Sequence, residues 1–158
     1  MVDVLVLGSG SAGYYTALLC ALNGLHVTLV EKEALGGTGF GYGALPVKIL
    51  LDSIKENPNI SFQQLLEDYG IKLAAVQNKL ESDLKGAGVK IVYGEGQFVE
   101  RDAVKVQDNI IKAKNIVIAT GSRPAHISDV PCGNHILTHK EALFLDRLPK
   151  DMIILGGN

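Results

Sequence analysis

Apolar residues follow two different periods in the first thirty positions of the chain. The short β-branched run Asp3–Leu7 predicts a buried strand, and apolar positions between Ser11 and Asn23 predict a helix. Gly24 falls where a left-handed helix cap belongs, and Val27–Val30 predicts a second buried strand. The pattern therefore predicts a strand–helix–strand unit, which is the building block of parallel sheets.

Helical spacing dominates the middle of the chain. The glycine-rich stretch Ala34–Leu45 predicts a loop, or a loop that runs into a helix over about Val47–Lys55 with Pro46 as an early helical position. Apolar residues then recur three and four positions apart over Phe62–Leu84. This spacing predicts one long amphipathic helix, or two helices that meet at Gly70.

The rest of the chain changes to the short runs typical of strands. A strand over Val89–Tyr93 is followed by three short alternating runs between polar turns, over Gln97–Val99, Ala103–Val106 and Ile110–Ala113. One more buried strand, a short helix and a last strand are predicted over Asn115–Ala119, Lys140–Leu145 and Met152–Leu155. The whole pattern predicts an α/β, Rossmann-like domain with a central parallel sheet, helices on its faces and a small antiparallel β-meander.

Composition narrows the class of protein without changing this picture. The 158 residues are 47% hydrophobic and 20% charged, as in an ordinary soluble globular domain. A net charge of -2 with scattered basic residues predicts neither a nucleic-acid nor a membrane partner, and the run Val4–Leu7 is too short to span a bilayer. Cys20 and Cys132 lack metal or disulfide spacing, so we expect no metal site and a cytoplasmic location.

Three glycines between the first strand and the first helix have a spacing that suits a dinucleotide. Gly8, Gly10 and Gly13 form G-x-G-x-x-G, in which the first makes the tight turn, the second admits the pyrophosphate and the third lets helix and strand pack. The helix that starts near Ser11 and Ala12 offers unpaired N–H groups to phosphate oxygens. Alone this motif is common, but here it follows a strand and opens a helix, which favours a nucleotide site.

Glu31 ends the second strand, about where such units carry an acidic residue. Its carboxylate can accept hydrogen bonds from the two ribose hydroxyls of an AMP group, and it repels a 2′-phosphate. NADP is therefore disfavoured, and FAD and NAD remain. A second glycine-rich loop over residues 36–43, directly after the acidic residue, favours FAD.

At this second loop the sequence resembles the FAD domain of the pyridine nucleotide–disulfide oxidoreductases, most closely the dihydrolipoamide dehydrogenases. Their pattern L-G-G-T-C-x-x-x-G-C-x-P-S-K is matched at Leu35, Gly36, Gly37, Thr38, Gly43, Pro46 and Lys48. Downstream matches cover Gly94–Phe98, Ala119–Pro124, Lys140–Leu143, Leu148-Pro149 and Ile153–Gly157. The resemblance implies a Rossmann-like FAD-binding domain over residues 1–150 and the start of an NAD(P)H-binding domain over 151–158.

The resemblance also implies which residues hold FAD. Lys48 would lie beside the flavin ring, although a solvated helix lysine is the alternative, and Thr38 would contact the pyrophosphate or merely stabilise a turn. The predicted cofactor-binding residues are Gly8, Gly10, Ser11, Ala12, Gly13, Glu31, Lys32, Gly37, Thr38, Lys48, Glu95, Gly96, Ala119, Thr120, Gly121 and Ser122.

Two departures from the family pattern matter for function. The positions of the redox cysteines carry Gly39 and Ala44, which form neither a thiolate nor a disulfide. The chain also stops at Asn158, inside what resembles a second glycine loop, so we expect a truncated piece of a longer, homodimeric protein. NAD(P)H would bind only to that longer protein.

Three hypotheses follow for the function of the chain. It is the FAD-binding domain of an oxidoreductase without the redox disulfide and is inactive alone, or a nucleotide-binding domain that has lost its chemistry, or a structural fragment with an empty site. No residue of this chain is predicted to be catalytic. Bound FAD would separate the first two hypotheses from the third.

Overall fold

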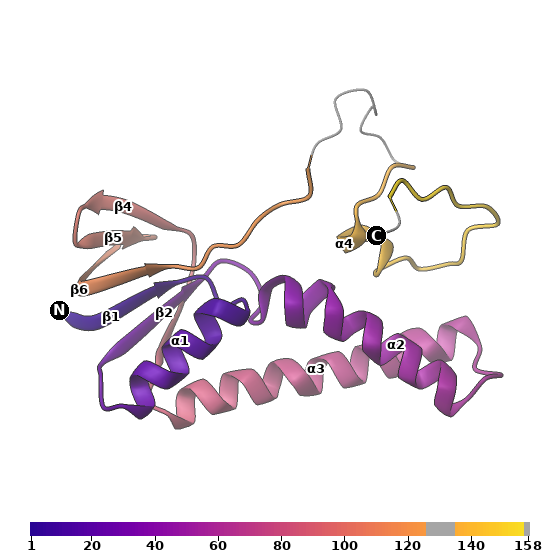
Figure 1. Cartoon of the computed structure of the whole chain (residues 1–158), viewed down its shortest axis with the longest axis horizontal. Coiled ribbons are helices and arrows are strands. Elements are labelled where there is room, and N and C mark those ends of the chain that lie inside the picture. The colour runs from indigo at the N-terminus through magenta and orange to yellow at the C-terminus, as the bar shows by residue number, and fades with distance from the viewer. Residues whose placement is uncertain (126–134, 157–158) are drawn as a thin grey trace.

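The computed structural model describes residues 1–125 and 135–156, which form a mixed α/β structure (Figure 1). Cys132 and His126 lie outside the described residues. The strands are β1 (Val2–Leu7), β2 (Val27–Glu31), β3 (Lys90–Tyr93), β4 (Gly96–Glu100), β5 (Ala103–Val106) and β6 (Asn109–Ile118). The helices are α1 (Ser11–Leu22), α2 (Ala44–Glu56), α3 (Phe62–Gly86) and α4 (His139–Ala142), with a π-helical turn, η1, over Thr38–Tyr42.

Within the described residues, six strands form one sheet in the order β3-β2-β1-β6-β5-β4. The first four are parallel, with Leu5 of β1 opposite Thr28 of β2 on one side and Ile116 of β6 on the other. The last three form the antiparallel β-meander. The predicted fold class is confirmed, and β1 lies between the strand that follows it and the strand that returns from the meander.

The sequence prediction of two strands over residues 110–113 and 115–119 is wrong, because β6 is a single strand. Its first part pairs antiparallel with β5 up to Lys112, and its second part pairs parallel with β1 from Ala113 onward. Lys114 interrupts the apolar pattern but does not end the strand, because each half of β6 is hydrogen-bonded to a neighbouring strand. One strand therefore joins the meander to the parallel sheet.

Two apolar clusters hold the sheet to its neighbours. On one face, Val4 and Leu29 pack with Tyr14 of α1 and Leu84 of α3, and Figure 1 shows both helices running beneath the sheet. A second cluster joins other side chains of β1 and β2 to those of the meander, among them Leu5, Leu7, Val30, Val104 and Val106. The helices and the meander thus cover different parts of the same central strands.

The structure extends two predicted helices. α3 is one continuous helix through the exposed Gly70, and a capping box between Ser61 and Gln64 starts it. α2 begins at Ala44, three residues earlier than predicted, so the loop prediction for residues 34–45 holds only up to η1. Pro46 occupies the first turn of α2, where a missing N–H costs no intrahelical hydrogen bond.

The last described segment is less regular than predicted. The predicted helix over Lys140–Leu145 is only the four-residue α4, after which Phe144 packs near Tyr69 of α3. The predicted strand over Met152–Leu155 is absent, and the side chain of Ile153 is 90% exposed. A strand needs a neighbour to complete its hydrogen bonds, and in residues 1–125 and 135–156 none pairs with this run.

Tyr69 offers a test of the packing between α2 and α3. Its side chain is 4% exposed, and its hydroxyl has no hydrogen-bond partner in the described part of the chain. An unsatisfied buried hydroxyl destabilises a fold, so we expect Tyr69→Phe to raise the free energy of unfolding by about 1 kcal/mol, measured by urea denaturation. The control Tyr14→Phe should lower it, because the Tyr14 hydroxyl donates to Asp83 (3.3 Å). A loss of stability in Tyr69→Phe would contradict the lack of a hydrogen-bond partner for that hydroxyl among the described residues.

Candidate functional site

The carboxyl ends of the parallel strands bring the sequence motifs to one edge of the sheet. The N–H of Gly8, after β1, donates to the carbonyl of Val30 in β2 (2.8 Å). The N–H of Ala119, after β6, donates to the carbonyl of Leu7 (2.8 Å), and the N–H of Gly94, after β3, to that of Glu31 (2.8 Å). In open α/β sheets ligands bind at this edge, where neighbouring connections leave in opposite directions.

The three glycines of the first loop have different surroundings. A Cβ atom on Gly13 would lie inside the contact distance of the Gly8 carbonyl oxygen and 2.9 Å from its carbon. Gly8 has a φ of +95° and lies against the backbone of Ala119, so a side chain is excluded there as well. A Cβ atom on Gly10 would meet nothing within 4 Å. Gly8 and Gly13 are thus required by packing, while Gly10 borders open space at the start of α1.

The Glu31 carboxylate is buried at the end of β2 and accepts four hydrogen bonds. Oε2 accepts from the backbone N–H of Ser9 (2.8 Å) and from the Ser9 hydroxyl (2.6 Å). Oε1 accepts from the backbone N–H groups of Lys32 (2.8 Å) and Glu33 (2.9 Å). The acidic residue and the glycine turn, 22 positions apart in the sequence, are therefore directly joined.

The second glycine loop lies against the first. Gly36 and Gly37 both have positive φ angles, +110° and +53°, and a Cβ on Gly37 would lie 2.8 Å from the Cα of Gly10. The Gly36 N–H donates to the Ser9 hydroxyl oxygen (3.1 Å). Thr38 then begins η1. We call the first glycine loop (residues 8–13), Glu31 and the second glycine loop (residues 36–43) together the cradle.

The remaining predicted cofactor residues differ in their relation to the cradle. Ser11, Ala12 and Lys32 are exposed beside it, as are Glu95, Thr120, Gly121 and Ser122 after β3 and β6. Gly96 has a packing role instead, because a Cβ there would lie 3.2 Å from both Leu7 and Val104. The structure therefore brings most of the predicted residues to one edge of the sheet.

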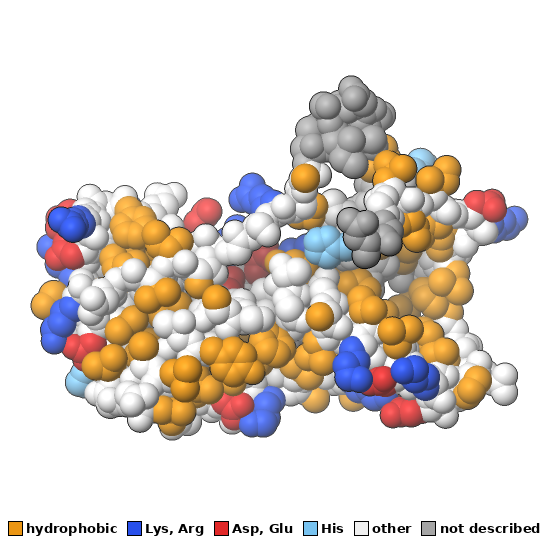
Figure 2. All heavy atoms as spheres, viewed as in Figure 1, with side chains coloured by type: hydrophobic (Ala, Val, Ile, Leu, Met, Phe, Trp, Pro, Cys, Tyr) orange, Lys and Arg blue, Asp and Glu red, His pale blue; other side chains and the backbone are white. Residues whose placement is uncertain are grey.

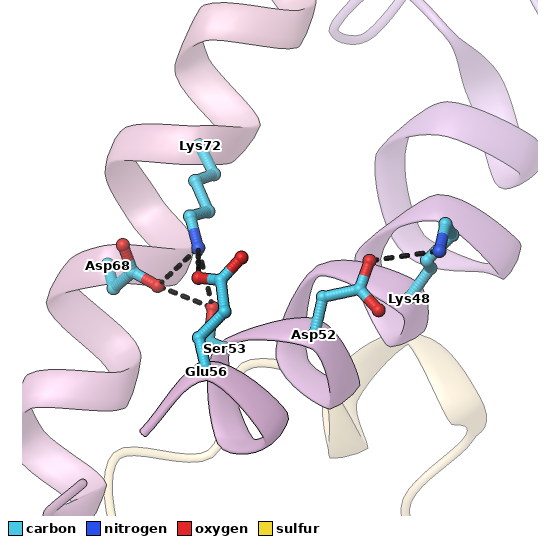
Figure 3. Close-up of polar contacts among 6 residues, drawn as sticks. All are labelled: Lys48, Asp52, Ser53, Glu56, Asp68 and Lys72. Atoms are coloured by element: carbon cyan, nitrogen blue, oxygen red, sulfur yellow. Dashed lines mark hydrogen bonds and ion pairs between the residues drawn. The ribbon is translucent and has the colours of Figure 1, made fainter.

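Lys48 is turned to the exposed side of α2. Its ammonium pairs with Asp52 one turn later (2.9 Å), and its side chain is 69% exposed. Figure 3 shows this pair beside a separate cluster, in which Lys72 of α3 reaches Ser53 (3.0 Å), Asp68 (2.9 Å) and Glu56 (3.3 Å). The hydroxyl of Ser53 also donates to Asp68, whose pKa is lowered by that bond and by Lys72. The cluster holds α2 against α3.

Gly39 and Ala44, at the positions where the family pattern predicts cysteines, lie in η1 and shortly after it. Gly39 is next to the glycine turn, since a Cβ there would lie 2.8 Å from the hydroxyl oxygen of Ser11. Ala44 is exposed at the first position of α2. Phe40, between them, packs toward Tyr14 with ring centroids 6.0 Å apart. Residues 39–44 therefore begin beside the first glycine loop and contain no sulfur atom.

A contact that the sequence did not suggest ties α4 to the far side of the cradle. The Lys140 ammonium pairs with Glu33 (2.7 Å) and lies 4.4 Å from the centre of the Tyr42 ring. Its hydrogen bond lowers the pKa of the Glu33 carboxyl.

The role of Ser9 does not follow from the glycine motif, because Ser9 occupies a position at which the motif G-x-G-x-x-G specifies no residue. The only sequence signal for Ser9 is a hydroxyl within a turn that faces an acidic strand end.

Other features bear on the class of protein. Within the described residues, no group of His, Cys, Asp or Glu side chains is arranged to hold a metal ion, and no helix has the length and apolar character needed to cross a bilayer.

Two surface features lie away from the cradle. Tyr15, Leu19 and Leu22 of α1 are more than half exposed, and Figure 2 shows apolar side chains gathered over this helix. A pocket with a volume of about 300 Å³ lies between α3 and residues 143–146, outside the cradle.

The amino-acid sequence is similar to those of several dihydrolipoyl dehydrogenases. Dihydrolipoyl dehydrogenases of Staphylococcus aureus and Bacillus subtilis are 33% and 34% identical to the chain over 174 and 178 aligned positions, 98% of the chain and 37% of their own lengths. That of Chlorobaculum parvum is 36% identical over 176 positions and is covered to 38%. The chain therefore spans little more than a third of these relatives.

The fold is also similar to a solved structure. The HOCl-induced flavoprotein disulfide reductase RclA from Escherichia coli matches with a TM-score of 0.83 and 22% identity, over 93% of this chain and 35% of that one. The family model described as pyridine nucleotide-disulphide oxidoreductase matches residues 2–158. The sheet order, the glycine turn joined to Glu31 and this match over nearly the whole chain agree, and the chain belongs to the pyridine nucleotide–disulphide oxidoreductase family.

Proposed function

We propose that the cradle binds FAD, as the first part of the flavin site of an oxidoreductase similar to dihydrolipoyl dehydrogenase. The observation that carries this proposal is the direct contact between Glu31 and the glycine turn at Ser9 (2.8 Å). It places a carboxylate, which suits ribose hydroxyls, next to the N-terminal end of α1, which suits a diphosphate. An AMP group with an attached diphosphate matches both features at once.

Several residues of the cradle suit particular parts of the AMP half. Gly10 leaves open space in front of α1, whose N-cap makes no side-chain hydrogen bond, so N–H groups of Ser11 and Ala12 remain for phosphate oxygens. Glu31 would orient the ribose. Thr120 to Ser122 follow the strand on the other side of β1, where they would close on the same nucleotide. Bound FAD supplies hydride transfer at its isoalloxazine ring.

The absence of thiols at Gly39 and Ala44 leads us to propose that this flavin does not reduce a disulfide of its own chain. The longer protein would pass hydride between a nicotinamide and FAD, and then to an acceptor other than lipoamide. A nucleotide-binding domain without redox activity is the alternative that the same two residues favour. A homodimeric parent and a cytoplasmic location stay predictions from the sequence.

Titration of the purified chain with FAD tests the binding proposal. We expect the flavin fluorescence to change on binding, and ADP to displace FAD by competing for the AMP part of the cradle. FMN, which lacks that part, should bind more weakly, and NADPH should not compete because Glu31 repels its 2′-phosphate. A chain that is folded by circular dichroism and takes up no FAD would contradict the proposal.

NADH oxidation by the longer protein separates the two versions of the proposal. Turnover with a quinone or oxygen but not with lipoamide would support the oxidoreductase without a disulfide. FAD binding without NADH oxidation would favour the non-catalytic alternative. Rapid NADH–lipoamide turnover would contradict our interpretation of Gly39 and Ala44.

A further inference from the structure

Ser9 is the fully buried centre of the cradle. Its exposed fraction is 0%, and its hydroxyl makes two contacts with distant parts of the chain. The oxygen accepts a hydrogen bond from the Gly36 N–H (3.1 Å), and the hydroxyl hydrogen is donated to Oε2 of Glu31 (2.6 Å). Both distances lie in the normal range for hydrogen bonds. One small side chain thus connects the first glycine turn, the end of β2 and the second glycine loop.

The Glu31 carboxylate has no acceptor position left in this arrangement. An ionised carboxylate offers about four lone-pair positions. The N–H groups of Ser9, Lys32 and Glu33 and the Ser9 hydroxyl already supply four donors. A ribose hydroxyl that donates to Glu31 would be a fifth donor. At least one donor of the chain must therefore give way before the ribose can bind as the proposed function requires.

The Ser9 hydroxyl is the donor that can leave most easily. The three N–H groups belong to backbone that is held by the ladder bonds of Gly8 to Val30 and of Gly94 to Glu31 (both 2.8 Å). Moving any of them would shift a strand end. The hydroxyl, in contrast, changes direction by rotation about one side-chain bond. Once turned away from Glu31, this buried donor loses a charged acceptor, which costs binding free energy.

We propose that the Ser9 hydroxyl competes with the ribose hydroxyls for Glu31 and so sets the affinity of the cradle for the AMP half of its cofactor. This inference rests on the proposed function and concerns the same site. In the protein without nucleotide, the Ser9 hydroxyl donates to the Glu31 carboxylate and so stabilises the fold. Nucleotide binding must break this hydrogen bond, which lowers the affinity for the nucleotide. Stability of the free protein and affinity for the nucleotide therefore depend on Ser9 with opposite signs.

Binding of ADP to Ser9→Ala tests this competition by isothermal titration calorimetry. We expect the variant to bind ADP about two- to tenfold more tightly than the parent chain, as one hydrogen bond is removed from the free state. Its melting temperature without ligand should fall, because the Gly36 N–H loses its acceptor. With 2′,3′-dideoxy-ADP, which has no ribose hydroxyls, parent and variant should bind equally.

Two further variants make the result specific. Thr16→Ala removes a hydroxyl that bonds within α1, to the carbonyl of Ala12 (2.7 Å), and should bind ADP like the parent. Ser9→Cys, whose thiol is a weak donor, should also bind ADP more tightly and protects the test if the alanine variant does not fold. Weaker or unchanged ADP binding by a folded Ser9 variant would overturn the competition, whereas a parent chain that binds neither ADP nor FAD would overturn the proposed function itself.

Discussion

Gly13→Ala is expected to disrupt the fold even without ligand. The added Cβ would overlap the Gly8 carbonyl oxygen and lie 3.2 Å from the Ala119 side chain. Both neighbours are fixed, Gly8 by its bond to Val30 and Ala119 by its bond to Leu7. Helix α1 would have to move away from β1, and overpacking of this kind costs about 3 kcal/mol or more when backbone must shift. Chemical denaturation of the free protein measures the loss.

Gly10→Ala is the matched control within the same motif. Its φ of -59° suits alanine, and the new Cβ would meet nothing within 4 Å. The variant should keep the stability of the parent chain but bind FAD more weakly, because the methyl group would occupy space that we assign to the pyrophosphate. Equal stability of the two variants would contradict the different surroundings of the two glycines, and unchanged FAD affinity of Gly10→Ala would contradict the assigned place of the pyrophosphate.

Glu31→Gln is the second change with a large expected effect. The substitution keeps the size of the side chain but places an amide NH2 where one oxygen now accepts two hydrogen bonds. Donors would then face donors in a buried site, and two N–H groups or an N–H and a hydroxyl would lose their acceptor. Because each such bond to a charged group contributes about 1.5–3 kcal/mol, we expect a loss of roughly 3 kcal/mol in unfolding free energy. FAD affinity should fall as well.

Glu33→Gln provides the comparison for this effect. Glu33 lies two positions later, its side chain is 48% exposed, and its ion pair with Lys140 is open to solvent. Exposed pairs contribute little, so the melting temperature should change only slightly. If Glu31→Gln were as mild as Glu33→Gln, the four hydrogen bonds around Glu31 would not contribute to stability as the structure indicates.

Local pattern was sufficient for most elements of the fold. The first strand, predicted over Asp3–Leu7 and found over Val2–Leu7, the helix that begins at Ser11 and the glycine cap at Gly24 follow from periods and turn residues, which act within one element. The fusion of two predicted strands into β6 did not follow, because Lys114 interrupts the apolar run and only the partners β5 and β1 keep the strand continuous. Met152–Leu155 shows the same dependence, because no strand within residues 1–125 and 135–156 pairs with this apolar run and an unpaired run forms no ladder.

For the site, the sequence by itself determined which groups are present: three spaced glycines, an acidic strand end and a second glycine loop that contains Gly39 and is followed by Ala44. Only the tertiary structure decided how they meet. Gly13 and Gly10 look alike in a motif, but one is required by packing and the other borders open space. Ser9 became part of the site because the sheet brings it to Glu31 and Gly36. Hydrogen bonds need distance and direction, and for residues 22 or 27 positions apart the fold alone supplies both.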